Sequence, residues 1–435
     1  MQTLAIRDGR ILHPDMTVAE ADVLVDRAAG EIVEIGAGLD GDEELDASDG
    51  LVIPGLVNAH THVAMTLLRG HADDKPLDTW LREDIWPVEA ALEPADIEAG
   101  AALGVLEMIR SGTTTFADMY FEIDRTADVV ERAGLRAVLG HGAIAAGKAA
   151  AEARDDVEES IAMARELDGA ADGRISTAVM PHSLTTVTPE LLELAAEGAA
   201  DAGVPVHYHA NETVDEVDPI VAERGQRPLE WAQDLGLCDD SAFLAHGVHL
   251  DDAEMALLAE TGTGVVHCPA SNMKLASGMA PVQRLLDAGV SVGLGTDGAA
   301  SNNDLDLFDE LRDAAMLGKL AADDASAVAA PDAVRMATAG GASVLGLDAG
   351  RIEPGAAADL AVLDLDLPHL TPRHDLVSHL AYAAKGSDVR HTVCDGTVLM
   401  RDREVLTLDE AAVMERAEKR ARGLLKRAGV RDETA

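Results

Sequence analysis

Short apolar runs alternate with longer Ala-, Glu- and Leu-rich stretches through the middle of the chain. Each short run is typical of a buried strand, and each longer stretch has the apolar spacing of a helix. Most of the runs end in a histidine or an aspartate, and their eight ends fall at residues 58–60, 115–118, 138–141, 179–182, 206–209, 244–246, 265–267 and 294–297. This pattern predicts an α/β fold with a (β/α)8 TIM-type barrel, whose C-terminal strand ends gather polar side chains at one face.

Both ends of the chain have a different pattern, in which short apolar strands are separated by turns. Neither end has enough strands to cover its own apolar face, so we expect the two ends to pair in one small β-sandwich. Near the C-terminus the apolar spacing becomes helical. We therefore divide the chain into a composite β-sandwich of residues 1–52 and 353–405, a barrel of residues 53–352, and a C-terminal helix within residues 406–435.

Acidic residues are spread over the whole chain and change the expected environment of the protein. The 79 Asp and Glu residues outnumber the 34 Lys and Arg residues, which gives a formal net charge of −45, and 7 of the basic residues are lysines. A dispersed acidic surface is typical of a halophilic protein, because high salt screens the repulsion between carboxylates. An acidic face for a basic partner is the alternative. The composition disfavours nucleic acid as a partner, because there is no basic stripe to neutralise phosphates.

The N-terminal residues lack the basic start and long apolar core of a signal peptide, and no window has the roughly 18 apolar residues of a membrane span. Cys238, Cys268 and Cys394 are odd in number and far apart, which argues against a disulfide framework. We therefore expect a cytoplasmic protein with no membrane partner.

Two histidines, His60 and His62, close the first apolar run of the barrel. Side chains repeat with period 2 along a strand, so both imidazoles lie on one side and can bind the same cation. With His209 and Asp297 at two other strand ends, they make a set that leaves a coordination position for water, as a catalytic divalent site requires. His207 competes with His209, but we prefer His209 because it is nearer the C-terminal end of its strand.

Glu212 follows His209 by three residues, and we expect it to transfer protons. Attack of water on an aromatic ring carbon requires protonation of the neighbouring ring nitrogen, and a carboxylic acid beside a metal can supply that proton. A glutamate that complements a helix dipole is the alternative. His246 ends the sixth run and can hold the attacking oxygen through a hydrogen bond, whereas His249 lies past the strand and is expected to be structural.

Four motifs together resemble the amidohydrolase superfamily, and within it the 5'-methylthioadenosine/S-adenosylhomocysteine deaminase family. They are PGLVNAHTH at 54–62, HANE at 209–212, HGVHL at 246–250 and GTDGAASN at 295–302. The resemblance implies one Zn2+ per subunit on His60, His62, His209 and Asp297, with Asp297 also taking a proton from the attacking water. Another divalent metal is an alternative, since imidazole binds several. The fourth strand end offers no lysine to bridge two metals, so a mononuclear centre is expected.

The same resemblance assigns the substrate-binding residues. Glu89 would accept hydrogen bonds from the ribose hydroxyls, His182 would contact the nucleoside, and Ser301 would lie near the base. Trp80 would line the pocket, and a core aromatic is the alternative reading of that residue. Glu212 and Asp297 would also contact the substrate.

The implied activity is hydrolytic deamination of an adenine nucleoside, namely 5'-methylthioadenosine, S-adenosylhomocysteine, 5'-deoxyadenosine or adenosine, to the inosine-type product and ammonia. The alternatives are an enzyme of the guanine deaminase or triazine chlorohydrolase type, and a non-catalytic metal-binding paralogue. Glu212 and His246 argue against the paralogue, because a purely structural role would not require them. The resemblance is also compatible with a homo-oligomer.

His141 and Arg154 bear on the choice among these nucleosides. Relatives that bind the homocysteine tail have an arginine just after the third strand, where this chain has His141. A histidine is a weaker carboxylate partner than a bidentate guanidinium, so compact 5' groups are favoured over S-adenosylhomocysteine. Arg154 is a second candidate for the tail, although an acid-rich helical stretch around it favours a surface arginine.

Overall fold

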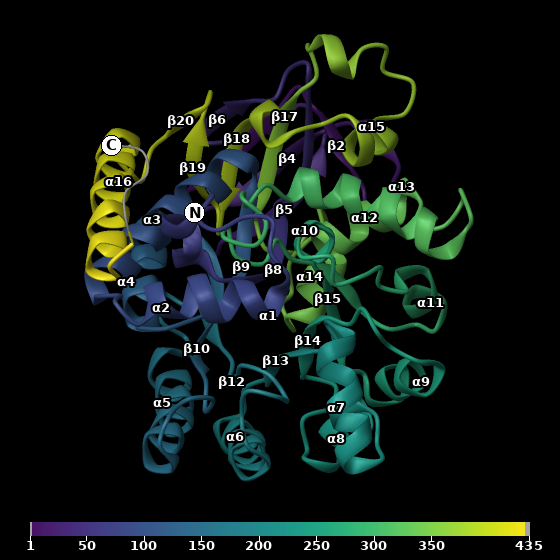
Figure 1. Ribbon diagram of the computed structural model, residues 1–435. Coiled ribbons are helices and arrows are strands. Elements are labelled where there is room, and N and C mark those ends of the chain that lie inside the picture. The colour runs from purple at the N-terminus through teal and green to yellow at the C-terminus, as the bar shows by residue number, and fades with distance from the viewer. Residues whose placement is uncertain (1, 431–435) are drawn as a thin grey trace.

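Eight parallel strand positions close into a barrel in the computed structural model, which describes residues 2–430 (Figure 1). In order around the barrel they are β8 (Leu56–Thr61), β9 (Thr113–Tyr120), β10 (Arg136–Ala143), β11 (Ile175–Thr177) with β12 (Met180–Pro181), β13 (His207–Ala210), β14 (Phe243–His246), β15 (Gly264–His267) and β16 (Val292–Leu294). β16 pairs with β8, and bridges from Val179 to Val206 and from Ser183 to His209 join the fourth position to β13. The predicted (β/α)8 barrel is confirmed.

Helices surround this barrel and connect its strands. They are α3 (Pro94–Ser111), α4 (Ile123–Ala133), α5 (Ala150–Leu167), α6 (Pro189–Ala202), α7 (Val214–Arg224), α8 (Pro228–Asp234), α9 (Asp252–Thr261), α10 (Pro269–Lys274), α11 (Val282–Asp287), α12 (Leu307–Ala322), α13 (Ala330–Arg335), the π-helix η3 (Met336–Gly340) and α14 (Gly341–Val344). α4 illustrates the local reason: Ile123, Ala127 and Val130 are buried at helical spacing, and Gly134 ends the helix with a left-handed φ of 88°.

Short helical elements follow the first barrel strand and cover one side of the strand ends. They are the 3-10 helix η1 (Val63–Leu68), α1 (Leu77–Trp80), the π-helix η2 (Leu81–Ile85) and α2 (Trp86–Glu89). Trp80, Ile85 and Val88 from these elements are buried in one apolar cluster. This part of the chain therefore forms a wall above the barrel.

Strands from both chain ends form two sheets that share an apolar core. One sheet has the order β20 (Glu404–Val405), β19 (Thr397–Arg401), β18 (Val389–Cys394), β17 (Leu360–Asp364), β7 (Gly50–Pro54), β2 (Arg10–Leu12) and β3 (Val18–Glu20), and the other has the order β5 (Glu31–Gly36), β4 (Asp22–Asp26), β1 (Thr3–Arg7) and β6 (Glu43–Asp46). β7 pairs antiparallel with β17 from Gly50–Asp364 to Pro54–Leu360. The expected pairing of the two ends is therefore confirmed, whereas the domain boundaries stay a prediction.

Gly55 alone separates β7 from β8, so the sandwich runs directly into the strand that carries His60 and His62. Its amide donates to the Asp359 carbonyl at 2.8 Å, which fixes the junction. A Cβ at this position would lie 2.1 Å from Thr114 Oγ1, so only glycine fits. The sandwich thereby fixes the start of the strand on which the histidines are placed.

The last elements lie outside the barrel. They are η4 (Pro368–Leu370), α15 (Leu376–Tyr382), η5 (Gly386–Asp388) and α16 (Glu410–Arg427). Figure 1 shows α16, in yellow, alongside α3, which it contacts. The helix expected within residues 406–435 is α16, and residues 431–435 lie outside the described residues. Among residues 2–430, no helix combines the length and the apolar composition needed to cross a membrane.

We expect transfer from molar KCl to low salt to unfold the protein. A net charge of −45 on one folded chain is self-repulsive, and the screening length grows from about 3 Å at 1 M to about 10 Å at 0.1 M salt. Circular dichroism melting over a KCl series checks this, with a rising Tm as the expected result. Sucrose serves as the control, because a neutral osmolyte does not screen charge. Full structure and activity after dialysis into salt-free buffer would refute the halophile interpretation.

Candidate metal centre

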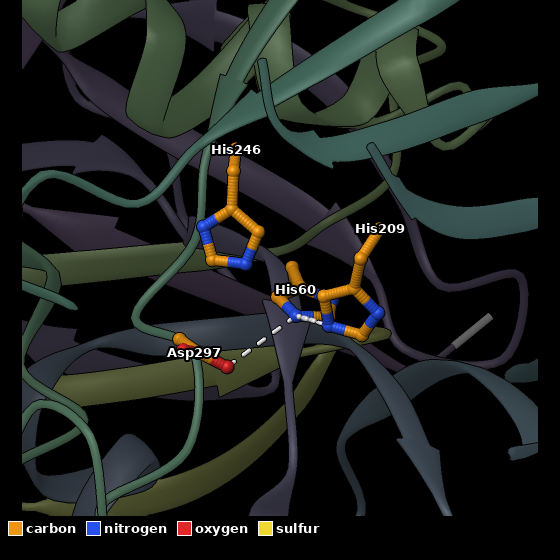
Figure 2. Close-up of side chains that lie close together, drawn as sticks. All are labelled: His60, His209, His246 and Asp297. Carbon is orange, nitrogen blue, oxygen red and sulfur yellow. Dashed lines mark hydrogen bonds and ion pairs between the residues drawn. The ribbon is translucent and has the colours of Figure 1, made fainter. Parts of the chain in front are cut away.

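Four buried groups meet at the C-terminal face of the barrel. The possible ligand atoms of His60, His209, His246 and Asp297 all lie within 4.8 Å of one another, and Figure 2 shows the side chains facing a common point. His60 lies one residue before the end of β8, and His209 lies one residue before the end of β13. Both are therefore at the C-terminal end of a barrel strand, as the sequence predicts. His246 and Asp297 adopt positive φ values of 76° and 59°, an uncommon backbone conformation that is concentrated at functional sites.

His62 lies beside this group and points at the same carboxylate. Its Nε2 is 3.3 Å from Asp297 Oδ1, and His60 Nε2 is 3.5 Å from the same oxygen. The ring centroids of His62 and His209 are 5.3 Å apart. The structure thus brings together all four residues that the sequence proposes as metal ligands, with His246 as a fifth group.

Backbone carbonyls fix the tautomers of two of these imidazoles. His209 Nδ1 lies 2.7 Å from the His182 carbonyl oxygen, and His62 Nδ1 lies 2.6 Å from that of Met119. A carbonyl only accepts, so each Nδ1 carries the proton and donates it. Each Nε2 is therefore left with a free lone pair that faces the centre, the arrangement usual for metal-binding histidines.

His60 has the same tautomer, which a second histidine, His207, fixes. His207 Nδ1 donates to the Phe243 carbonyl at 3.0 Å, so its Nε2 is an acceptor, and it lies 2.8 Å from His60 Nδ1. His60 Nδ1 is then the donor, and His60 Nε2 has the lone pair. This nitrogen is 3.1 Å from His209 Nε2, so two lone pairs face each other with no proton between them. A cation at this point satisfies both, and the donor set fits a divalent metal.

Burial keeps two of the imidazoles in the neutral form that binds metals. It lowers the pKa of His60 to about 4 and that of His209 well below its usual value. Burial also lowers the pKa of His62, but the hydrogen bond and charge of Asp297 outweigh it and raise that pKa to about 9. A proton and a cation therefore compete for the His62 Nε2 lone pair.

Asp297 is held ionised and in one orientation. Burial would raise its pKa, but the interactions with the imidazoles of His60 and His62 outweigh burial and hold the pKa well below its usual range. Its Oδ2 accepts hydrogen bonds from Ser271 Oγ and Ser301 Oγ, both at 2.7 Å. Because both serines bind Oδ2, Oδ1 alone faces the imidazoles. The resemblance places Ser301 near the nucleobase of the substrate, and in the structure its hydroxyl donates to this carboxylate.

Glu212 stands next to His246 at the edge of the same group. Its Oε1 accepts a hydrogen bond from Ser277 Oγ at 3.1 Å, and its Oε2 is 3.7 Å from His246 Nε2. His246 Nδ1 lies 3.0 Å from Asn272 Oδ1 and donates to it, so its Nε2 faces Glu212. Burial raises the pKa of Glu212, which suits a carboxyl group that delivers a proton near neutral pH.

A cavity of about 980 Å³ opens above these residues, at the upper end of the size range of small-molecule sites. The sequence-predicted residues that line it are Trp80, Glu89, His62, His182, His209, Glu212, His246, Asp297 and Ser301. His60 lies beneath the floor and is fully buried. The cavity therefore brings together the proposed metal, acid and substrate residues.

The substrate-side residues have separate local supports. Glu89 Oε1 accepts a hydrogen bond from the Tyr120 hydroxyl at 2.7 Å, and burial raises the pKa of Glu89. His182 Nδ1 lies 3.0 Å from Thr186 Oγ1, and burial lowers the pKa of His182 to about 3. Trp80 lines the cavity and is also packed in the apolar cluster, so both readings of this residue hold.

His141 and Arg154 lie away from the cavity lining. His141 is buried on β10 with its Nε2 3.3 Å from Asp156 Oδ1, and Lys148 Nζ is 2.8 Å from the other oxygen of that carboxylate. Arg154 pairs with Glu158 on the exposed side of α5 at 3.1 Å, as expected of a surface arginine. In this conformation His141 therefore faces Asp156 and does not line the cavity.

Comparisons with known proteins agree on one family. The model described as "Amidohydrolase family" matches residues 51–399. A 5-methylthioadenosine/S-adenosylhomocysteine deaminase of Haloarcula marismortui is 67% identical over 431 residues, which cover 99% of this chain and 100% of that protein. A 5'-deoxyadenosine deaminase of Methanothermobacter thermautotrophicus is 49% identical over 382 residues, 87% of this chain and 88% of that one. The crystal structure of an adenosine deaminase from Xanthomonas campestris with bound zinc superposes with a TM-score of 0.91 at 39% identity, covering 97% of this chain and 98% of that one.

Proposed function

Because the chain belongs to the amidohydrolase family, we propose that it is a metal-dependent enzyme that hydrolytically deaminates adenine nucleosides. The observation that carries this proposal is the convergence of imidazole lone pairs and an ionised carboxylate beside Glu212 at the floor of the cavity. The relatives named above support the nucleoside as substrate.

Zinc is the proposed ion, and its proposed ligands are His60, His62, His209 and Asp297. The zinc-bound adenosine deaminase structure supports the choice of ion. His246 is the other candidate ligand, but its Nε2 faces the Glu212 carboxylate at 3.7 Å, which suits a group that holds the attacking oxygen. When bound, a divalent cation supplies Lewis acidity, which brings the deprotonation of water into the neutral pH range.

The chain's own residues account for the proton transfers. Asp297 Oδ1 faces the centre and would accept a proton from the attacking water, while the two serines hold Oδ2. Glu212 gives its proton to the ring nitrogen beside the carbon under attack, and the C–O bond forms as electrons move onto that nitrogen. The exocyclic amine then gains the proton that Asp297 had accepted and leaves as ammonia when its C–N bond breaks, and the remaining hydroxyl proton returns to Glu212 as the 6-oxo group forms. His246 steadies the oxygen throughout.

Four residues are proposed to hold the nucleoside. Glu89 has one oxygen bound by Tyr120, so the other can accept from ribose hydroxyls. His182 is neutral, follows β12 and lines the cavity, where it contacts the nucleoside. Trp80 packs along the cavity, and Ser301 lies beside Asp297 near the base.

We further propose a cytoplasmic homo-oligomer that acts on free nucleosides and binds neither nucleic acid nor membranes. The net charge of −45 opposes binding to phosphate backbones. Cys238, Cys268 and Cys394 are free thiols, which suits a reducing compartment.

Ammonia release in molar KCl tests this proposal. We expect the zinc-loaded protein to turn over 5'-methylthioadenosine and 5'-deoxyadenosine about tenfold faster, in kcat/KM, than S-adenosylhomocysteine. Arg82 is the only Lys or Arg among the described residues of the cavity lining, and its Nε is 2.5 Å from Asp78 Oδ1, so an added carboxylate has to compete with Asp78 for this guanidinium. Guanine and a chlorotriazine serve as controls. If the protein turns over guanine or the chlorotriazine and none of the adenine nucleosides, the assignment of adenine nucleosides as substrates is wrong.

A further inference from the structure

The cavity wall that carries Glu89 depends on a helix from the far end of the chain. Residues 77–92 contain α1, η2 and α2, and they contribute Trp80, Arg82, Trp86 and Glu89 to the lining. This segment pairs with no strand of the barrel. Its position therefore depends on side-chain packing and on hydrogen bonds from neighbouring helices.

α16 supplies part of that packing. Leu424 is fully buried and belongs to the same apolar cluster as Trp80, Ile85 and Val88. Burying a leucine side chain contributes favourably to docking in proportion to its apolar area. The cluster thus joins the C-terminal helix directly to the wall of the cavity.

Arg427 makes the polar part of the connection. Its Nε donates to the Ala91 carbonyl at 3.1 Å, and another of its nitrogens pairs with Asp96 Oδ2. Arg420 pairs with Asp96 Oδ1 at 2.6 Å, and Asp96 is fully buried. Asp96 Oδ2 also accepts from the Glu93 amide at 2.8 Å at the start of α3. The guanidinium of Arg427 therefore joins α16 to both the turn after α2 and the start of α3.

The Ala91 carbonyl is close to Glu89 along the chain and through hydrogen bonds. α2 ends at Glu89, and the next turn is closed by the amides of Ala91 and Leu92, which donate to the carbonyls of Val88 and Glu89 at 3.0 Å. Carbonyls at the end of a helix have no partner within the helix and need one from outside. Arg427 supplies that partner two residues after Glu89, so a shift of this turn moves the Glu89 carboxylate.

We propose that Arg427 is a positioning residue that sets the place of Glu89 and thereby the preference for ribonucleosides. Leu424 assists by packing beneath the same segment. Arg427 does not touch the cavity and acts through the turn at Ala91. The inference rests on the proposed function, because it takes Glu89 as the acceptor of the ribose hydroxyls.

Steady-state kinetics with matched variants test the proposal. Arg427→Gln is expected to raise KM for adenosine about fivefold, to leave KM for 2',3'-dideoxyadenosine unchanged and to keep kcat, because the lost contact involves only the hydroxyls. Arg427→Lys keeps one donor for the Ala91 carbonyl and should recover most of the adenosine KM. Arg416→Gln is the control, since Arg416 lies on the same helix and pairs with Glu98 at 2.6 Å, away from residues 77–92.

Equal losses with both nucleosides, or the same losses in Arg416→Gln, would overturn the proposal. Hydrogen–deuterium exchange adds a readout that needs no turnover. We expect faster exchange in peptides of residues 77–92 in Arg427→Gln, and unchanged exchange in peptides of β10. Unchanged exchange in residues 77–92, or equal acceleration everywhere, would also overturn it. If the wild-type protein releases no ammonia from adenosine, the proposed function fails, and the exchange result still decides whether Arg427 holds this segment.

Discussion

Replacing Glu212 with glutamine is expected to lower kcat by on the order of 10³-fold while the metal stays bound. The amide has the shape of the carboxyl group but cannot deliver a proton to the ring nitrogen. The Glu212 oxygens contact Ser277 and His246, and the metal ligands proposed here do not include Glu212. Ammonia release and metal analysis on the same preparation check both parts of this prediction.

Glu216→Gln is the matched control for this experiment. Glu216 lies one turn further along, lines the same cavity, and accepts a hydrogen bond from the Glu212 amide at 2.9 Å. Burial raises its pKa to about 8, so this carboxyl is mostly neutral at pH 7. Its amide replacement should therefore change kcat by less than about threefold. A Glu212→Gln protein that keeps its rate would remove Glu212 from the role of acid.

Replacing His209 with alanine is expected to abolish stoichiometric zinc binding, and activity with it. His209 Nε2 faces His60 Nε2 at 3.1 Å, so its lone pair is part of the centre itself. His207, two residues earlier, contacts His60 Nδ1 and offers no nitrogen to the centre itself. His207→Ala should therefore weaken zinc binding by about 10- to 100-fold, the usual effect of losing a partner of a ligand. Titration of each protein with zinc against a chelator measures the difference.

The two histidines are a stringent pair because they share one face of one strand. His209 lies one residue before the end of β13 and therefore at the rim of the barrel, whereas His207 lies two residues earlier and below it. Zinc bound tightly by His209→Ala and lost from His207→Ala would reverse the assignment. It would also make the lone-pair geometry at His60 irrelevant to the metal.

The barrel and its ligand residues could be predicted because both have strong local signals. Buried parallel strands are apolar runs, and period 2 alone places His60 and His62 on one side. The pairing of the chain ends was predictable for a similar reason, since neither end could bury its own strands.

The partners that hold the site together have no such signal. Ser271 binds Asp297 from 26 residues away, and Ser277 binds Glu212 from 65 residues away. Ser271 lies in the short helix α10 and Ser277 in the loop that follows it, and a single serine gives no periodic pattern, so its contact depends on the fold around it. Tyr120, which binds Glu89, has no such signal either, because it ends β9 two residues beyond the strand end predicted at 115–118.

The orientation of His141, whose role the sequence left open, has a simple physical cause. Gly142 lines the cavity, so the side chain one residue earlier on β10 points to the other face, toward α5. There it meets Asp156, and its carbonyl accepts from Ser160 Oγ at 2.7 Å. The alternation that pairs His60 with His62 also separates His141 from the cavity.

The most direct test of the central claim is deamination of 5'-methylthioadenosine in water enriched in ¹⁸O. The zinc-loaded protein, in molar KCl, should release one equivalent of ammonia and place one ¹⁸O on the ring carbon that carried the amine, as hydrolytic attack requires. Mass spectrometry of the product and an ammonia assay give both values from one reaction. A zinc-loaded, folded protein that releases no ammonia, or a product whose ring oxygen does not come from water, would contradict the account.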